Sequence, residues 1–193
     1  MSTSTYKVGT MSKLGFALLG QLMRGDRTGY DLAQEFQNRL SHFWNAKHSQ
    51  VYPELQKLKK LRFVTMSKVK QSSRPDKKVY TITSTGESAL LEWVLSPLPD
   101  SPVRSELHLR THSIHLVPKD QAIAFYETEL VKTEAEYRDF EQQIAKIETS
   151  FNGVPPTNIE VFAAYANLKF GLENRKQVAD WSKWLISSLQ KEL

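Results

Sequence analysis

The fold of this chain is decided by Ser49-Gln50-Val51-Tyr52-Pro53-Glu54-Leu55-Gln56-Lys57-Leu58-Lys59-Lys60-Leu61. Val51, Leu55 and Leu58 recur at helical spacing, which predicts a helix that begins near Ser49 and buries one apolar face. A proline in a helix interior removes a backbone hydrogen bond and clashes, so we expect Pro53 to lie in the first turn. The helix then leaves these side chains near the outside: Ser49, Gln50, Tyr52, Pro53, Glu54 and Lys57.

The hydrophobic period changes directly after this helix. Residues 63–69 include Phe, Val, Met and Val, the stretch 70–76 is polar, and residues 77–83 alternate in polarity. The last of these segments, Lys-Lys-Val-Tyr-Thr-Ile-Thr, is also rich in residues that favour strands. Two short strands around a polar loop predict a β-hairpin.

Three further helices are predicted around the central helix and the hairpin. A mostly apolar helix covers residues 13–23, Thr28 caps the start of a second one, and Ser84 or Thr85 caps a helix after the hairpin. The order helix, helix, helix, hairpin, helix is that of a winged helix-turn-helix, so we expect a mainly α fold. The alternative is a small α+β domain whose hairpin is merely solvated.

Positive charge is concentrated in the first half of the chain. The net charge is +5, but residues 1–100 hold 15 Lys and Arg against 8 Asp and Glu, whereas residues 101–193 hold 11 against 13. The segment 57–78 carries nine basic residues against one acid, Asp76. A local positive excess suits a polyanion such as DNA, and it also suits a solvated basic surface.

A winged helix binds DNA by laying the helix before the hairpin in the major groove, with its N-terminal residues at base edges. Gln50 and Tyr52 can form hydrogen bonds there, so we expect them to contribute to specificity. Lys77 and Lys78 lie on the hairpin, where they would supply salt-dependent affinity for phosphates. The predicted DNA-binding residues are Lys47, His48, Ser49, Gln50, Tyr52, Pro53, Lys57, Arg74, Lys77 and Lys78.

The same half of the chain resembles a known family of regulators. The stretch from Phe43 to Leu55, Gly29-Tyr30-Asp31, and Tyr80-Thr81-Ile82-Thr83 followed by Gly86 are similar to the signature of PadR-type transcriptional regulators. The resemblance covers residues 13–95 well and the rest more weakly, in length and helical layout. It is strongest for the longer branch of the family, and within it for repressors that respond to phenolic acids. It implies a homodimer that binds an inverted-repeat operator and dissociates when an effector binds.

Three prolines mark the boundary between the two halves of the chain. They lie in the stretch 96–102, where they stop the preceding helix and stiffen the backbone. We therefore expect a winged-helix domain of residues 1–95, this linker, and a helical domain of residues 103–193 for dimerisation and effector sensing.

The second domain is predicted to contain three helices, over 103–116, from Asp120 to about Phe151, and from about Asn158 to the end. The apolar positions of the middle helix repeat in heptads with one gap at Thr133. We expect a second chain to cover the remaining apolar faces, with a monomeric helical hairpin as the alternative. The predicted dimerisation residues of the last helix, where the apolar stripe shifts in phase, are Leu172, Val178, Trp181, Leu185 and Leu189.

A small aromatic effector is expected to bind between the two domains. A phenolic acid has a carboxylate and an apolar ring, so it needs a polar group at one end and aromatic side chains around the ring. Arg110 and His112 would supply the first, and Phe16, Trp44 and Tyr126 the second. An ion pair for Arg110 and core packing for Phe16 and Trp44 are the alternatives.

Three histidines, His108, His112 and His115, share one face of the helix predicted over 103–116. The spacing His-x-x-x-His can bind a metal, but no carboxylate or cysteine completes the set. We therefore predict no metal site, and expect these histidines to line a helix contact or a pocket.

The sequence argues against several functional classes. It has no cysteine, which removes disulfides and thiolate zinc sites. It has no Gly-rich phosphate loop and no nucleophile motif, so we expect no enzyme activity and no cofactor. Its apolar runs are too short to span a bilayer and no signal peptide is recognised, which predicts a cytoplasmic protein without membrane contact. Two rival functions remain: a multidrug-responsive repressor of an efflux pump, and a protein-interaction module that does not bind DNA.

Overall fold

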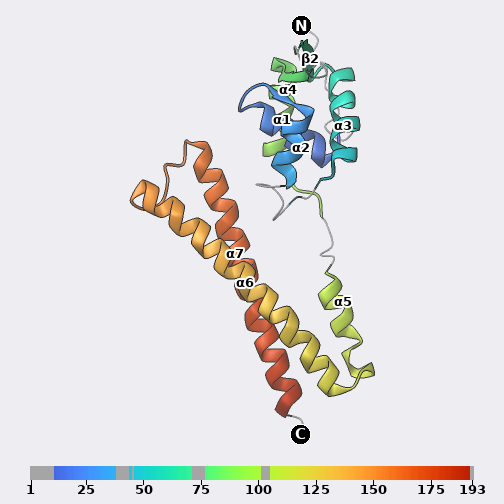
Figure 1. Cartoon of the computed structure of the whole chain (residues 1–193), viewed down its shortest axis with the longest axis vertical. Coiled ribbons are helices and arrows are strands. Elements are labelled where there is room, and N and C mark those ends of the chain that lie inside the picture. Colours follow the sequence, from blue (N-terminus) through green and yellow to red (C-terminus); the bar gives the residue numbers. More distant parts are fainter. Residues whose placement is uncertain (1–10, 38–43, 45, 71–76, 101–104, 192–193) are drawn as a thin grey trace. The chain divides into compact units, whose positions relative to one another are not determined.

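The computed structural model describes residues 11–37, 44, 46–70, 77–100 and 105–191, and the chain divides into two compact units, 1–100 and 101–193 (Figure 1). The first unit contains α1 (Lys13–Leu22), β1 (Arg27–Thr28), α2 (Gly29–Gln37), α3 (His48–Lys60), β2 (Val64–Val69), β3 (Lys77–Ile82) and α4 (Ser84–Leu95). The second contains α5 (Glu106–His112), the 3-10 turn η2 (Ile114–Leu116), α6 (Lys119–Phe151) and α7 (Glu160–Lys191). The predicted mainly α fold with a hairpin wing is confirmed.

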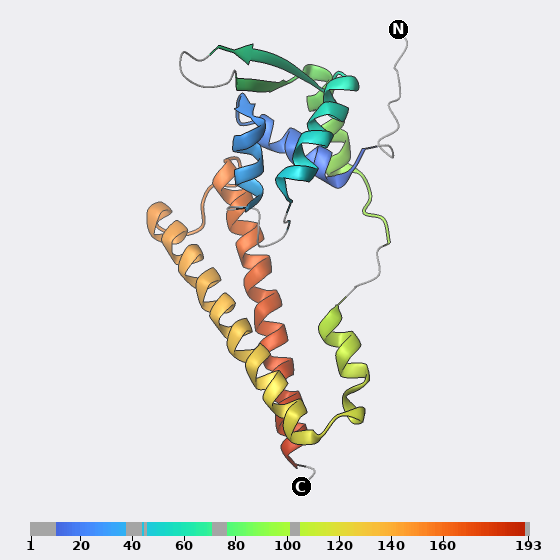
Figure 2. The ribbon, with the colours of Figure 1, turned by 45° about the vertical axis from the view of Figure 1, so that its right-hand side comes forward.

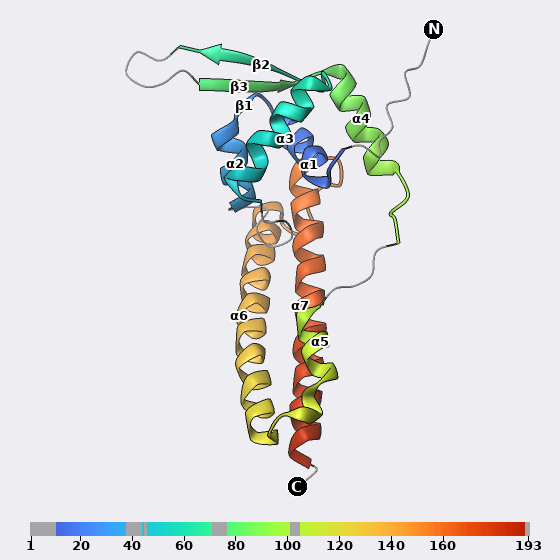
Figure 3. The ribbon, with the colours of Figure 1, turned by 90° about the vertical axis from the view of Figure 1, so that its right-hand side faces the viewer.

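The hairpin is part of a three-stranded antiparallel sheet. Strand β3 lies in the middle, with β2 paired on one side and β1 on the other. Figure 3 shows β2 and β3 as a two-stranded ribbon, with β1 beside β3. β1 consists only of Arg27 and Thr28, and two residues carry no period from which a strand can be predicted.

Threonines begin two helices of the first unit. The hydroxyl of Thr28 accepts a hydrogen bond at 3.1 Å from the backbone N–H three residues on, so the predicted N-cap of α2 is confirmed. Helix α4 begins one residue earlier than predicted, because Thr83 is its N-cap rather than Ser84 or Thr85. The backbone N–H of Thr83 also donates to the carbonyl of Phe63 at 3.0 Å, which ties the start of α4 to the start of the wing.

One apolar core holds the first unit together. Its side chains come from α1, α2, α3, α4 and the sheet, and Val51, Leu55 and Leu58 of α3 are fully buried in it. The predicted apolar face of α3 is therefore confirmed. Burying an apolar side chain of this size contributes roughly 1.5–3 kcal/mol, so the core fixes α3 firmly against its neighbours.

The sequence predicted that Pro53 lies in the first turn of α3, but the structure does not place it there. The helix begins at His48, which places Pro53 in the helix interior. The missing N–H leaves the carbonyl of Ser49, four residues earlier, without its helical donor. Both residues are exposed, so water can bond to this carbonyl and the helix tolerates the proline. The prediction was therefore wrong.

The second unit is built on the antiparallel pair α6 and α7 (Figure 2). The predicted long helix is confirmed as α6, which begins at Lys119. The helix predicted over 103–116 is shorter, because α5 ends at His112 and a 3-10 turn follows Ser113. No helix of the described residues is both long and apolar enough to cross a membrane.

The gap in the heptad seam of α6 is a packed position. Thr133 occupies it and is only 8% exposed. Its hydroxyl donates to the carbonyl of Glu129 at 2.9 Å, so the polar group is satisfied within its own helix. The seam of α6 therefore continues through Thr133.

Helix α7 packs on two neighbours, which explains the phase shift predicted after Leu172. The heptad toward α6 continues through three weakly apolar or polar positions and then an isoleucine, all buried or half-buried: Arg175, Ala179, Ser182 and Ile186. Arg175 bonds to Glu136 of α6 at 2.7 Å. Trp181, which belongs to the shifted stripe, instead packs near Tyr126 and lies 5.6 Å from the ring of His108 on α5.

Candidate nucleic-acid interface

The start of α3 presents the polar side chains that the sequence predicts to bind DNA. Lys47 is the N-cap residue, and Oε1 of Gln50 accepts a hydrogen bond from its backbone N–H at 2.9 Å. This bond uses the acceptor of the amide, so Gln50 would meet DNA with its Nε2 donor. His48 is half-buried, and the other predicted residues of this helix are exposed: Lys47, Ser49, Gln50, Tyr52, Pro53 and Lys57.

Tyr52 is held against the start of α2. A Cβ atom added to Gly29 would lie 2.6 Å from Cε1 of Tyr52, so the ring lies directly on the backbone of α2. Tyr52 nevertheless remains 42% exposed. Glycine at position 29 thus permits a contact that holds the ring in place and leaves part of it accessible.

Glu54 is buried, contrary to the prediction that it lies near the outside. Its side chain is 8% exposed. Its carboxylate accepts from the hydroxyl of Ser12 at 2.7 Å and from Nζ of Lys57 at 3.3 Å. A buried carboxylate needs such partners, and Ser12, as the N-cap of α1, links the two helices. The available signal was the position of Glu54 three residues after Val51, on the apolar face.

The wing carries positive charge on both strands. Lys68 of β2 lies directly opposite Lys78 of β3, and Val69 lies opposite Lys77. The three lysines are exposed, and like charges directly opposite each other repel. The hairpin therefore offers a positive surface that suits phosphates. Lys68 was not among the predicted DNA-binding residues, and Arg74, which was, lies outside the described residues.

The aromatic residues proposed for the effector differ in accessibility within the first unit. Phe16 is 2% exposed and stacks on Trp93, with ring centroids 4.7 Å apart. Trp44 is 37% exposed. Phe16 is thus placed as a core residue, whereas Trp44 offers an accessible aromatic surface.

Arg110 and Tyr126 belong to one aromatic cluster of the second unit. Nε of Arg110 donates to Glu106 at 3.0 Å, and its guanidinium lies 5.6 Å from the ring centre of Phe125. Tyr126 is 2% exposed, and its hydroxyl lies 2.8 Å from that of Thr111. The Arg110 ion pair is exposed, so the guanidinium stays accessible to another carboxylate.

The three histidines do not share one helix. His108 and His112 lie on α5, whereas His115 lies in the 3-10 turn that follows. No group of three His, Cys, Asp or Glu is placed to hold a metal ion within the part of the chain that the structure describes.

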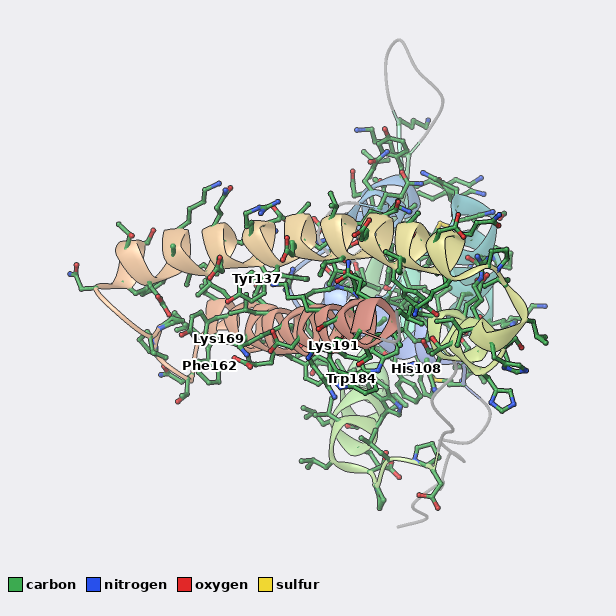
Figure 4. All side chains as sticks on the ribbon, turned by 90° about the horizontal axis from the view of Figure 1, so that it is seen from below. His108, Tyr137, Phe162, Lys169, Trp184 and Lys191 are labelled. Atoms are coloured by element: carbon green, nitrogen blue, oxygen red, sulfur yellow. The ribbon has the colours of Figure 1, made fainter. Side chains whose placement is uncertain are left out.

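The predicted dimerisation stripe contributes to packing within the chain. Three of its members belong to the cluster around Tyr126: Trp181, Leu185 and Leu189. The other two are half-buried: Leu172 and Val178. Elsewhere on α7, Phe170 and Trp184 are 75% and 62% exposed. Figure 4 shows Trp184 on the side of α7 away from α6.

Comparison with known proteins finds relatives along nearly the whole chain. The profile of the "Transcriptional regulator PadR-like family" matches residues 18–92. The negative transcriptional regulator PadR of Bacillus subtilis is 31% identical over 184 residues, which cover 94% of this chain and 100% of that protein.

Two crystal structures of Bacillus subtilis PadR are similar to this fold. The complex with operator DNA has a TM-score of 0.84 and 30% identity, and covers 92% of this chain and 99% of that one. The complex with p-coumaric acid has a TM-score of 0.77 and 29% identity, and covers 92% and 98%. These relatives are transcriptional regulators rather than enzymes.

Proposed function

The chain belongs to the PadR-like family of transcriptional regulators, and from this premise we propose that it is a homodimeric repressor that binds an inverted-repeat operator. A small aromatic effector, a phenolic acid, releases it from the DNA. The observation that carries the proposal is the exposed polar start of α3, in the same unit as a wing with three exposed lysines. Because a repressor acts where the DNA is, we place it in the cytoplasm.

The shape of the first unit supports contact with the major groove. Helix α3 is long enough to present several side chains to a groove that admits one helix. Ser49, Gln50 and Tyr52 are proposed to meet bases or nearby backbone, and Lys57 and the wing lysines to meet phosphates. The buried partners of α3 hold these side chains in a fixed register. The structure of the Bacillus subtilis relative with operator DNA is consistent with this role.

A homodimer is proposed because an inverted repeat needs two copies of α3 about one DNA turn apart. Trp181, Leu185 and Leu189 already pack within the chain. We therefore place the subunit contact on the side of α7 that exposes Phe170 and Trp184. Apolar side chains that gather in one exposed patch mark interaction surfaces, and we propose that Phe170 and Trp184, which are close to four helical turns apart and so share one face of α7, belong to such a patch. Val178 is proposed to border this contact. Leu172 lies two residues after Phe170, about 200° round the helix, so it is proposed to support the α6–α7 packing instead.

The effector is proposed to be a phenolic acid, because the Bacillus subtilis relative binds p-coumaric acid. The exposed guanidinium of Arg110 offers a fork for the carboxylate, which would replace Glu106 as its partner. Trp44 and His112 are proposed to contact the ligand. Phe16 and Tyr126 are buried, each within its own unit, so we propose that they act through the residues that cover them rather than by direct contact with the ligand.

The function is tested by selecting DNA from a random duplex pool with the full-length chain. We expect an inverted repeat to be enriched, and the double variant Gln50→Ala, Tyr52→Ala to lose the preference between this operator and random DNA. Lys146→Ala, an exposed change on α6, serves as the control and should retain the preference. A pool that stays random at low salt contradicts the proposal.

A further inference from the structure

Tyr30 is an exposed aromatic residue in the first turn of α2 that the predicted DNA contacts do not include. It is 59% exposed, although its ring is large and partly apolar. The ring lies 5.8 Å from that of His48, the first residue of α3, at an interplanar angle of 43°. Tyr30 therefore lies beside the end of α3 where the predicted DNA-binding residues are found.

The hydroxyl group of Tyr30 is oriented by its neighbour Gln34. Nε2 of Gln34 donates a hydrogen bond to the phenol oxygen at 3.1 Å. An amide nitrogen only donates, so the phenol oxygen is the acceptor and its own proton remains for another acceptor. Contacts to the ring and to the oxygen thus hold the side chain in place while it stays exposed.

On the basis of the proposed DNA-binding function, we propose that the hydroxyl of Tyr30 donates a hydrogen bond to a phosphate oxygen of the DNA backbone. Tyrosine is among the side chains that make such contacts, which fix the position of a protein on the duplex. A charged acceptor makes the bond stronger than one between neutral groups. Because the phenol is neutral, the contact releases no counterion and adds affinity without adding salt dependence.

The test is Tyr30→Phe, which removes the hydroxyl and keeps the ring. Binding of the full chain to a labelled random-sequence duplex of about 30 base pairs, room for two half-sites, is followed by fluorescence anisotropy. The salt concentration is varied between about 50 and 200 mM KCl. We expect the Kd to rise about tenfold at each salt concentration, with an unchanged slope of log Kd against log salt. Lys77→Ala, in contrast, should lower that slope by about 1.

Two further variants separate a phosphate contact from a structural role. Gln34→Leu keeps the hydroxyl and removes its partner, and should weaken binding less than Tyr30→Phe does. Tyr137→Phe on α6 should leave DNA binding unchanged. Thermal unfolding by circular dichroism shows whether each variant is folded.

Three outcomes overturn the inference. The first is that folded Tyr30→Phe binds DNA with wild-type affinity. The second is that Gln34→Leu loses as much DNA affinity as Tyr30→Phe does, which would mean that the hydroxyl only supports the local structure. The third is a wild-type chain that does not bind the duplex even at about 50 mM KCl, and this result alone also removes the proposed function.

Discussion

At the scale of single residues, Gly29 controls the position of Tyr52. A Cβ at position 29 would lie 2.6 Å from the Tyr52 ring, closer than side-chain atoms normally approach. Gly29→Ala must therefore displace the ring of Tyr52, which is 42% exposed and can turn toward solvent, so we expect a cost at the lower end of the range of about 1–3 kcal/mol for overpacked cores. We expect a lower free energy of unfolding in urea, together with weaker operator binding because Tyr52 changes position.

Gly20 provides the matched control for this substitution. It also lies in a helix, α1, but nothing lies within 4 Å of an added Cβ. Gly20→Ala should raise the free energy of unfolding by about 0.5–1 kcal/mol and leave DNA binding unchanged. If both substitutions changed stability in the same direction, the close approach at Gly29 would not be the controlling factor.

At the scale of secondary-structure elements, the DNA contacts proposed for the wing lysines would lower the stability of the hairpin itself. Lys68 and Lys78 are directly opposite each other, and such like-charged pairs destabilise a hairpin. Lys68→Glu replaces the repulsion by an attraction of about 0.2–1 kcal/mol. We expect slower hydrogen exchange in β2 and β3, but weaker DNA binding with a smaller salt slope. Stronger DNA binding by this variant would contradict the wing assignment.

The α6–α7 pair should respond to pH through an ion pair between Glu134 and Lys183, whose charged atoms are 2.7 Å apart. The hydrogen bond from Lys183 and its charge lower the pKa of Glu134. A lowered carboxyl pKa stabilises the fold above the unfolded pKa, and this contribution is lost as pH falls through the folded pKa. The pKa of Lys183 is raised, so its contribution is lost only as pH rises through that value.

The measurement is the melting temperature of the wild-type chain and of Glu134→Gln, from neutral pH down to pH values below the folded pKa of Glu134. We expect a small difference near neutral pH, since both groups are solvated. The difference should disappear as the medium becomes more acidic than the folded pKa of Glu134. Gln142→Glu, an exposed change on the same helix, should not reproduce this pattern. A difference that persists in strong acid would exclude the ion pair as its cause.

The sequence predicted those elements whose pattern is set by burial alone. The face of α3 followed from Val51 and its periodic neighbours, which the core buries completely. Polar residues that are buried with hydrogen-bonding partners escaped prediction, because such partners are invisible in a hydrophobic pattern. Glu54 is buried through Ser12 and Lys57, and Thr133 through its own helix. The accessibility of proposed site residues was equally hidden, since it depends on which neighbours cover each side chain.

At the scale of the whole molecule, assembly is expected to depend on the exposed side of α7. Trp184 is 62% exposed there, and a charge at this position could not be buried in a subunit contact without a partner. Trp184→Glu should shift the chain toward monomers in sedimentation velocity and weaken binding to a full inverted repeat. Gln142→Glu adds the same charge on α6 and should remain dimeric. A dimer of unchanged stability in Trp184→Glu would exclude this side of α7.

In the proposed dimer, binding of the effector and binding of the operator must affect each other reciprocally. A ligand releases DNA only through a difference between its affinities for the DNA-bound and the free protein. A coupling free energy of about 1–3 kcal/mol would lower DNA affinity roughly 5–150-fold, and operator DNA must weaken ligand binding by the same factor. We expect calorimetric titration with p-coumaric or ferulic acid to give this factor when performed with and without operator DNA.

Arg110→Met tests which group holds the carboxylate of the ligand. It removes the guanidinium while keeping a long side chain, and the Arg110 ion pair with Glu106 is exposed, so the loss of stability should be small. We expect weaker binding of p-coumaric acid and unchanged operator affinity without ligand. Lys132→Met removes a comparable exposed ion pair on α6 and should change neither.

Equal ligand affinity with and without operator would exclude the coupling even if the compound binds. Complete absence of binding would favour a multidrug effector, because a cationic drug needs aromatic surface such as Trp44 but no arginine.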